Sequence, residues 1–118
     1  MNQIEIEILR PQAALDAFAE TWQRAENNRE LTPRLAFGSL RELFSALTEK
    51  RLELMRHVAS HEGLNTHQLA QQLKRNYKNI HTDVAALIEL GLLEKDEKGL
   101  LSAPFDEIVI HAGLRDAA

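Results

Sequence analysis

The sequence contains no cysteine, which excludes disulfide bonds, thiolate metal sites and cysteine nucleophiles. Proline and glycine are also scarce, with three and five copies, and 27% of the residues are charged. Such a composition is typical of a globular chain and not of a disordered or fibrous one. A length of 118 residues suffices for one domain with its own hydrophobic core and leaves little room for a second.

Long hydrophobic runs are missing as well. No apolar stretch approaches the roughly 18 residues that a membrane span requires. The first residues, MNQIEIEILRPQ, lack a basic region followed by an apolar stretch, so they do not resemble a signal peptide. We therefore expect a cytoplasmic protein that does not bind membranes.

Charge is distributed unevenly along the chain. The net charge is −4, but residues 50–82 carry six basic and two acidic side chains, whereas the segments on either side are acidic. Four of the five histidines also lie in this middle segment, at positions 57, 61, 67 and 81. A polyanion is therefore expected to bind the middle of the chain.

Residues 1–47 are expected to form an extension of strands and helices. Ile4, Ile6 and Ile8 alternate with glutamates, which predicts a strand with one buried face. Pro11 begins a predicted amphipathic helix that runs to about residue 30 and carries Phe18 and Trp22. A short strand over 34–37 and a brief helix opened by the capping-box pattern of residues 39–42 follow.

Residues 48–112 show sharper signals, and residues 113–118 are expected to fray. Thr48 predicts the cap of one helix, and Asn65 with Gln68 predicts a capping box that opens a second. After a polar turn at 74–76, a third helix is expected over 76–90, ending before Gly91. A hairpin of residues 92–94 and 100–102 follows, and a last strand around 108–110 could pair with the first.

This order of elements predicts an α+β fold, a winged helix-turn-helix with an N-terminal strand and helix extension. In such a unit the second helix of the close pair lies in the major groove of DNA. With 100° per residue and a buried stripe through Ile80 and Val84, the face opposite this stripe carries no acid. Its members are Arg75, Lys78, Asn79, Thr82 and Ala86.

The predicted outward face has side chains suited to reading bases. Lysine pairs with guanine acceptors, asparagine with adenine, and threonine contacts the thymine methyl group, so we expect Lys78, Asn79 and Thr82 to be the readers. Further DNA contacts, chiefly with the backbone, are expected from Thr66, His67, Lys74, Arg75, Asn76, Lys95 and Lys98. Acids beside Lys95 and Lys98 predict a small contribution from the hairpin. A polar face that is merely solvated is the alternative.

Other interpretations of single residues are weaker. Tyr77 could stack or bind phosphate, but it falls near the buried stripe, so we expect it to pack in the core with its hydroxyl at the edge. Glu53, His57 and His61 share a helix face that could hold zinc, although a solvated face is the simpler interpretation. The adjacent acids at 106 and 107 would point to opposite faces of a strand, which does not suit acid–base catalysis. We expect no enzyme activity, metal or cofactor.

Three segments also resemble a known family. They are residues 66–95, from Thr66-His-Gln-Leu-Ala to Leu-Leu-Glu-Lys95, the run Leu47-Thr-Glu-Lys-Arg-Leu-Glu-Leu54, and the run Pro104-Phe-Asp-Glu-Ile108. Together they resemble MarR-like winged-helix regulators, especially a family of short prokaryotic DNA-binding proteins often encoded beside toxins. The resemblance implies a repressor or, alternatively, an antitoxin that binds a toxin protein and represses its own operon.

A homodimer is expected, because one winged helix reads few base pairs and specific repressors combine two half-sites. The extension is the predicted interface, and the strand over 106–111 could take part in it. Its candidate residues are Ile4, Ile6, Ile8, Phe18 and Trp22, although Phe18 and Trp22 could be simple core. A winged helix used only for contact with another protein is a third possibility.

Overall fold

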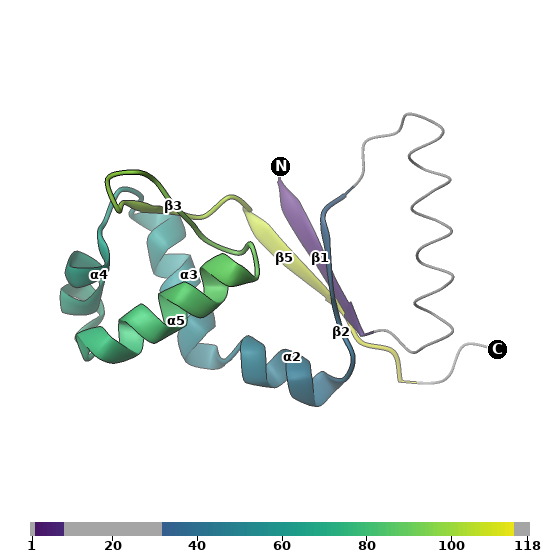
Figure 1. The fold of residues 1–118 in the computed structure, drawn as a ribbon. Coiled ribbons are helices and arrows are strands. Elements are labelled where there is room, and N and C mark those ends of the chain that lie inside the picture. The colour runs from purple at the N-terminus through teal and green to yellow at the C-terminus, as the bar shows by residue number, and fades with distance from the viewer. Residues whose placement is uncertain (1, 9–31, 115–118) are drawn as a thin grey trace. The chain divides into compact units, whose positions relative to one another are not determined.

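The computed structural model describes residues 2–8 and 32–114, and the predicted helix over 11–30 lies outside them (Figure 1). The described residues form an α+β fold with four helices and two small sheets. They divide into two units. Residues 46–106 form one, and residues 3–45 together with 107 onward form the other.

A three-stranded parallel sheet forms the second of these units. Its strands are β1 (Gln3–Ile8), β2 (Arg34–Phe37) and β5 (Glu107–His111), in the order β2-β1-β5. The predicted strands and the pairing of the last strand with the first are confirmed, with Ile4 opposite Ile108 and Ile6 opposite Ile110. Thus β5, within the predicted 48–112 segment, pairs with the extension.

The two faces of this sheet differ, as the alternation of isoleucine and glutamate predicts. Ile4 and Ile6 are 5% and 0% exposed. On the other face Arg34 forms ion pairs with Glu5 at 3.3 Å and Glu7 at 3.8 Å. These pairs are partly exposed, so they contribute little to stability.

The burial of Ile4 and Ile6 changes their expected role. Both are core residues of a single chain, so neither offers its side chain to a second copy as the structure stands. Ile8 is half-buried, whereas Phe18 and Trp22 lie outside the described residues. In contrast, Ile110 on the edge strand β5 is 45% exposed.

Ser39 caps helix α2 (Leu40–Ala46) as predicted, but the predicted capping box is only half formed, because Glu42 reaches the amide before the cap residue and not that of Ser39. Ser39 Oγ accepts a hydrogen bond from the Glu42 amide, and the Glu42 carboxylate accepts one from the Gly38 amide. Leu43 is buried, but Phe44 is 63% exposed. Only part of the apolar stripe of this helix therefore belongs to the core.

The unit of residues 46–106 contains three helices and a hairpin. They are α3 (Glu49–Ser60), α4 (Thr66–Leu73), α5 (Tyr77–Glu89), and the antiparallel strands β3 (Glu94–Lys95) and β4 (Leu101–Ser102). The predicted helix 76–90 and the hairpin are confirmed to within two residues. Helical spacing predicts that Leu52, Met55, Val58 and Ala59 form the buried stripe of α3. This prediction is partly wrong, because Leu54 is fully buried and Ala59 is exposed.

The core of this unit is aliphatic and draws on every element except β3. Its fully buried members are Leu54, Val58, Leu69, Ile80, Val84, Leu87, Leu92, Leu93 and Leu101. The hairpin is tied to the loop before α4, since Leu101 donates its amide to the Leu64 carbonyl at 2.8 Å and accepts from the Gly63 amide at 3.1 Å. None of the described helices has the length and apolar character needed to cross a membrane.

Candidate nucleic-acid interface

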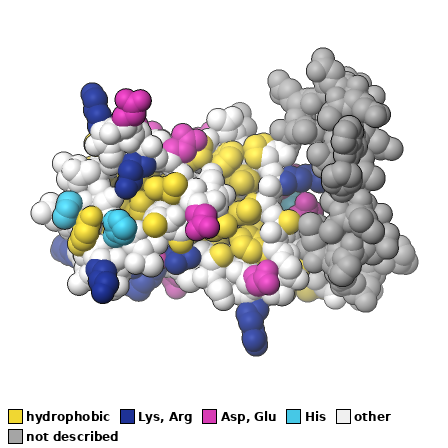
Figure 2. Space-filling view, viewed as in Figure 1, with side chains coloured by type: hydrophobic (Ala, Val, Ile, Leu, Met, Phe, Trp, Pro, Cys, Tyr) yellow, Lys and Arg dark blue, Asp and Glu magenta, His cyan; other side chains and the backbone are white. Residues whose placement is uncertain are grey.

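The twenty residues from Gly63 to Thr82 contain no aspartate or glutamate. They fold into α4, a three-residue turn and the first half of α5, and they carry Lys74, Arg75 and Lys78. Lys, Arg and His side chains gather over α4 and the start of α5 (Figure 2). This surface has the charge that an anionic ligand requires.

Helix α5 presents a polar face that its start positions. The Asn76 side chain caps the helix and accepts from the Lys78 amide at 2.8 Å. Lys78, Asn79 and Thr82 are all exposed, while Ile80 on the opposite side is fully buried. The spacing-based placement of these three residues is thus confirmed, and their role in reading bases stays a prediction.

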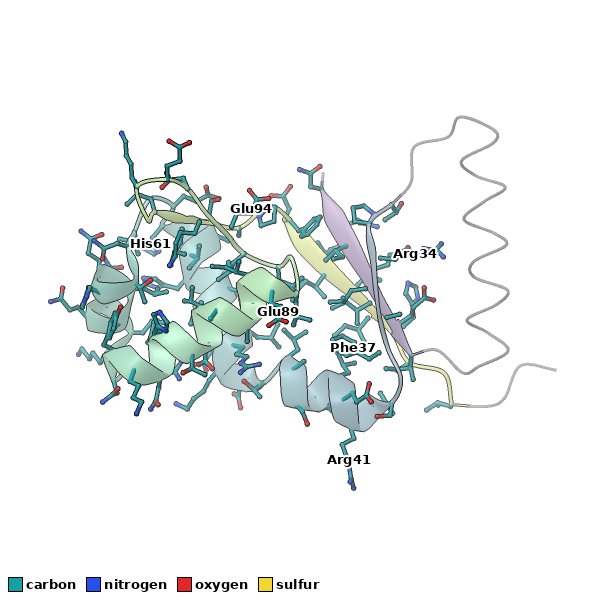
Figure 3. The ribbon with its side chains drawn as sticks, viewed as in Figure 1. Arg34, Phe37, Arg41, His61, Glu89 and Glu94 are labelled. Carbon is teal, nitrogen blue, oxygen red and sulfur yellow. The ribbon has the colours of Figure 1, made fainter. Side chains whose placement is uncertain are left out.

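The hydroxyl of Thr82 is partly used within the helix. It donates to the carbonyl of Lys78, one turn earlier, at 3.0 Å. The threonine can therefore offer a ligand its methyl group or an oxygen lone pair, but not the proton. The nearest acid on this helix outside the ion-pair network, Glu89, lies at the far end of α5 (Figure 3).

The first acid after this segment, Asp83, is turned inward. Its carboxylate accepts from Arg51 Nε on α3 at 3.0 Å and from Arg75 Nη2 in the turn at 2.8 Å. All three side chains are less than one-fifth exposed. The Asp83 charge is therefore neutralised by two arginines and does not oppose an anion at the exposed face.

Helical spacing predicts that Arg75 lies on the outward face of α5. This prediction is wrong. Arg75 precedes α5 and follows Lys74, whose φ of +54° turns the chain after α4. The angle of 100° per residue does not extend through such a turn. Arg75 links the turn to α5 instead of pointing to solvent.

The remaining residues predicted to contact the DNA backbone lie either around α4 and the turn after it or in the hairpin. His67 and Lys74 are exposed beside the α5 face, whereas Thr66 is 7% exposed and Asn76 is engaged as a cap. Lys95 and Lys98 are exposed at the hairpin, together with Glu94, Asp96 and Glu97. Both charge signs are visible there in Figure 2, and Glu94 is labelled in Figure 3. The hairpin thus offers no net positive charge.

A ring cluster that the sequence analysis missed lies at the start of α5. Tyr77 is 40% exposed, so its predicted place in the core is wrong. The His67 ring of α4 stacks on it at 4.0 Å with an interplanar angle of 9°, and His81 lies beside it at 5.9 Å. The i, i+4 spacing of Tyr77 and His81 could have revealed half of this cluster. The contact with His67 depends on how α4 packs against α5.

A family model, HVO_A0114, matches residues 46–110, more than half of the chain. The chain belongs to the HVO_A0114 family. The match covers α3, α4, α5, the hairpin and most of β5, and with them every candidate DNA contact. No curated protein and no solved structure matches the chain. The resemblance to MarR-like regulators stays a prediction.

Two histidines at the C-terminal end of α3 in this HVO_A0114-family chain stack on each other, and one of them contacts α4. The rings of His57 and His61 stack at 4.3 Å, and His57 Nε2 lies 2.6 Å from Gln72 Oε1. Within the described residues, no group of three or more His, Asp or Glu side chains could hold a metal ion. These histidines connect α3 to α4.

Proposed function

We propose that this protein is a sequence-specific DNA-binding transcriptional regulator, a repressor built as a winged helix-turn-helix. The observation that carries the proposal is the exposed face of α5, where Lys78, Asn79 and Thr82 stand free of acids while Asp83 is held inward by two arginines. The pair α4 and α5, joined by a three-residue turn and followed by a hairpin, supports this assignment.

In the proposed complex α5 enters the major groove with its N-terminal half. Lys78 can pair with the O6 and N7 acceptors of guanine, and Asn79 can bind adenine through two hydrogen bonds. Thr82 can contact a thymine methyl group through its own methyl group, since its hydroxyl proton is donated to the carbonyl of Lys78 and cannot be given to a base. The three side chains together would read two to three base pairs.

Backbone contacts set the register of this helix in the proposal. His67 and Lys74 are exposed and are assigned to phosphates. Arg75 is assigned a positioning role, because its guanidinium joins the turn to α5 through Asp83. The hairpin lysines at 95 and 98 would contribute little beside their acidic neighbours.

We also infer a homodimer, because so few base pairs cannot define an operator and two half-sites one helical turn apart can. Because Ile4 and Ile6 are buried within one chain, we assign the interface to other residues. Sedimentation at micromolar concentration tests this inference, and a monomer that binds its operator with full specificity would contradict it.

Fluorescence anisotropy tests DNA binding directly. The native protein is titrated with duplex DNA from immediately upstream of its own gene and with a scrambled duplex of equal composition. We expect preference for the native duplex, and the double variant Lys78→Ala/Thr82→Ala should lose at least tenfold of that preference. Lys50→Ala removes a lysine of α3 that is also exposed and serves as the charge-matched control.

The outcomes separate the classes of function. Equal losses in Lys50→Ala and in the double variant would contradict base reading by α5. Absence of binding to any duplex, including a random library, would contradict the proposal and favour a protein partner, such as the toxin that the resemblance implies.

A further inference from the structure

Tyr77 is an exposed aromatic residue in a chain with few aromatics. It is the first residue of α5 and 40% of it is exposed, directly before Lys78. It is also the single tyrosine of the sequence. A tyrosine in the core buries most of its ring, so packing alone does not explain this position.

The ring of Tyr77 is nevertheless held in place. His67 covers one face in a parallel stack at 4.0 Å, and His81, one turn along α5, lies against the ring at a tilt of 46°. One imidazole comes from each helix of the pair. With one face covered and a second ring beside it, the phenol presents chiefly its edge and its hydroxyl to a ligand.

The surroundings of this hydroxyl favour an anion. Lys74 and Lys78 are exposed within four residues of Tyr77, and no acid occurs between Gly63 and Thr82. A phenol O–H is a hydrogen-bond donor, and tyrosine is among the side chains that bind phosphate oxygens in protein–DNA complexes. A ring fixed before binding loses little conformational entropy when it binds.

We propose that Tyr77 is a DNA contact that donates its hydroxyl to a backbone phosphate, with His67 and His81 positioning the ring. This inference rests on the proposed function and adds a sequence-independent contact at the start of α5. It also assigns His67 a role that the sequence did not indicate, which is to orient Tyr77.

Tyr77→Phe tests the hydroxyl alone, because phenylalanine keeps the ring stack. We expect affinity to fall about tenfold for each protomer that contacts the duplex, the loss typical of one hydrogen bond to a charged group. The loss should be equal for native and scrambled DNA, since a phosphate contact carries no sequence information. Far-UV circular dichroism should show an unchanged fold.

The salt dependence of affinity distinguishes a neutral hydrogen bond donated by the Tyr77 hydroxyl from an ionic contact such as that of Lys74. Tyr77→Phe should leave the slope of log affinity against log salt unchanged, whereas Lys74→Ala should reduce it by about 0.9 for each protomer that contacts the duplex. His67→Ala should lower affinity at least as much as Tyr77→Phe does, and Tyr77→Phe should cost less in the His67→Ala background than in the native protein, because the two residues act through one contact. The control His61→Ala, which breaks a comparable ring stack on α3, should not lower affinity.

A spectroscopic readout follows from the single tyrosine. Protein labelled with ¹³C at the tyrosine Cζ gives one resonance, which we expect to move when either duplex is added. An unmoved resonance, binding of Tyr77→Phe within twofold of the native protein, or a loss confined to native DNA would each overturn the assignment. These results leave the proposed function intact, whereas native protein that binds no duplex would overturn both.

Discussion

The ion-pair network of Asp83 should be the main polar anchor of α5. Arg51 and Arg75 donate to its carboxylate at 3.0 and 2.8 Å, and the three side chains are 14 to 19% exposed. Asp83→Ala would leave two neighbouring guanidinium groups without their shared counter-charge. Arg75 Nη1 is already buried with no hydrogen-bond partner among the described residues, so nothing there compensates.

The expected loss follows from this geometry. Removing one partner of a fully buried ion pair costs about 3–5 kcal/mol, whereas exposed pairs contribute about 0–1 kcal/mol. The partial burial places Asp83→Ala between these limits, at about 2–3 kcal/mol of unfolding free energy. Arg51 keeps its bond to the Ala46 carbonyl at 2.8 Å, which limits the loss. For a chain of this size the midpoint of thermal unfolding should fall by roughly 8–12 °C.

Urea unfolding followed by far-UV circular dichroism measures this loss. Glu89→Ala, an exposed acid on the same helix, is the matched control and should change stability by no more than about 0.5 kcal/mol. Double-mutant cycles with Arg51→Met and Arg75→Met should each give a coupling energy above about 0.5 kcal/mol. If Asp83→Ala costs no more than Glu89→Ala, the network is solvated and does not anchor the helix.

Two further substitutions test the segments that position α5. Lys74 has a φ of +54°, a conformation that glycine adopts without strain, so Lys74→Gly should leave the unfolding free energy in urea unchanged or raise it by up to about 1 kcal/mol. The same substitution should weaken DNA binding. A clear loss of stability would show that Lys74 is not strained. Asn65→Ala should lower the unfolding free energy by about 1 kcal/mol, because Asn65 and Gln68 cap the start of α4 reciprocally. An unchanged urea midpoint would show that the capping box is dispensable.

Local signals account for most of the predicted fold. The cap at Thr48, the capping box at Asn65 and Gln68, and the isoleucine alternation each depend on residues a few positions apart, so the sequence contains them in full. The hairpin strands are shorter than expected for a physical reason. The amides of Leu92 and Leu93 both bond to the Leu87 carbonyl at the end of α5, so strand pairing begins only at Glu94.

In the candidate site, too, the features that depend on residues within one helix were predictable and those that depend on contacts between elements were not. The exposed face of Lys78, Asn79 and Thr82 follows from helical spacing, because all three lie within α5. Arg75 and Tyr77 were misplaced because their surroundings come from other elements. Arg75 is drawn to Asp83 by a turn with positive φ, and the Tyr77 ring is set by His67 of α4. A single-helix projection contains neither contact.

The net charge of −4 bears on how such a surface would discriminate between DNA sequences. Non-specific binding depends almost wholly on phosphate neutralisation, and an acidic protein gains little of it. At physiological salt the screening length is about 8 Å, so the surface of residues 63–82, which contain no acid, acts on DNA only at close range. Lys78, Asn79 and Thr82 of α5 would contact the bases within this distance. Repulsion from the acidic remainder of the chain would lower the affinity for operator and non-cognate DNA by the same factor, so the specificity ratio has to come from the contacts of the base readers.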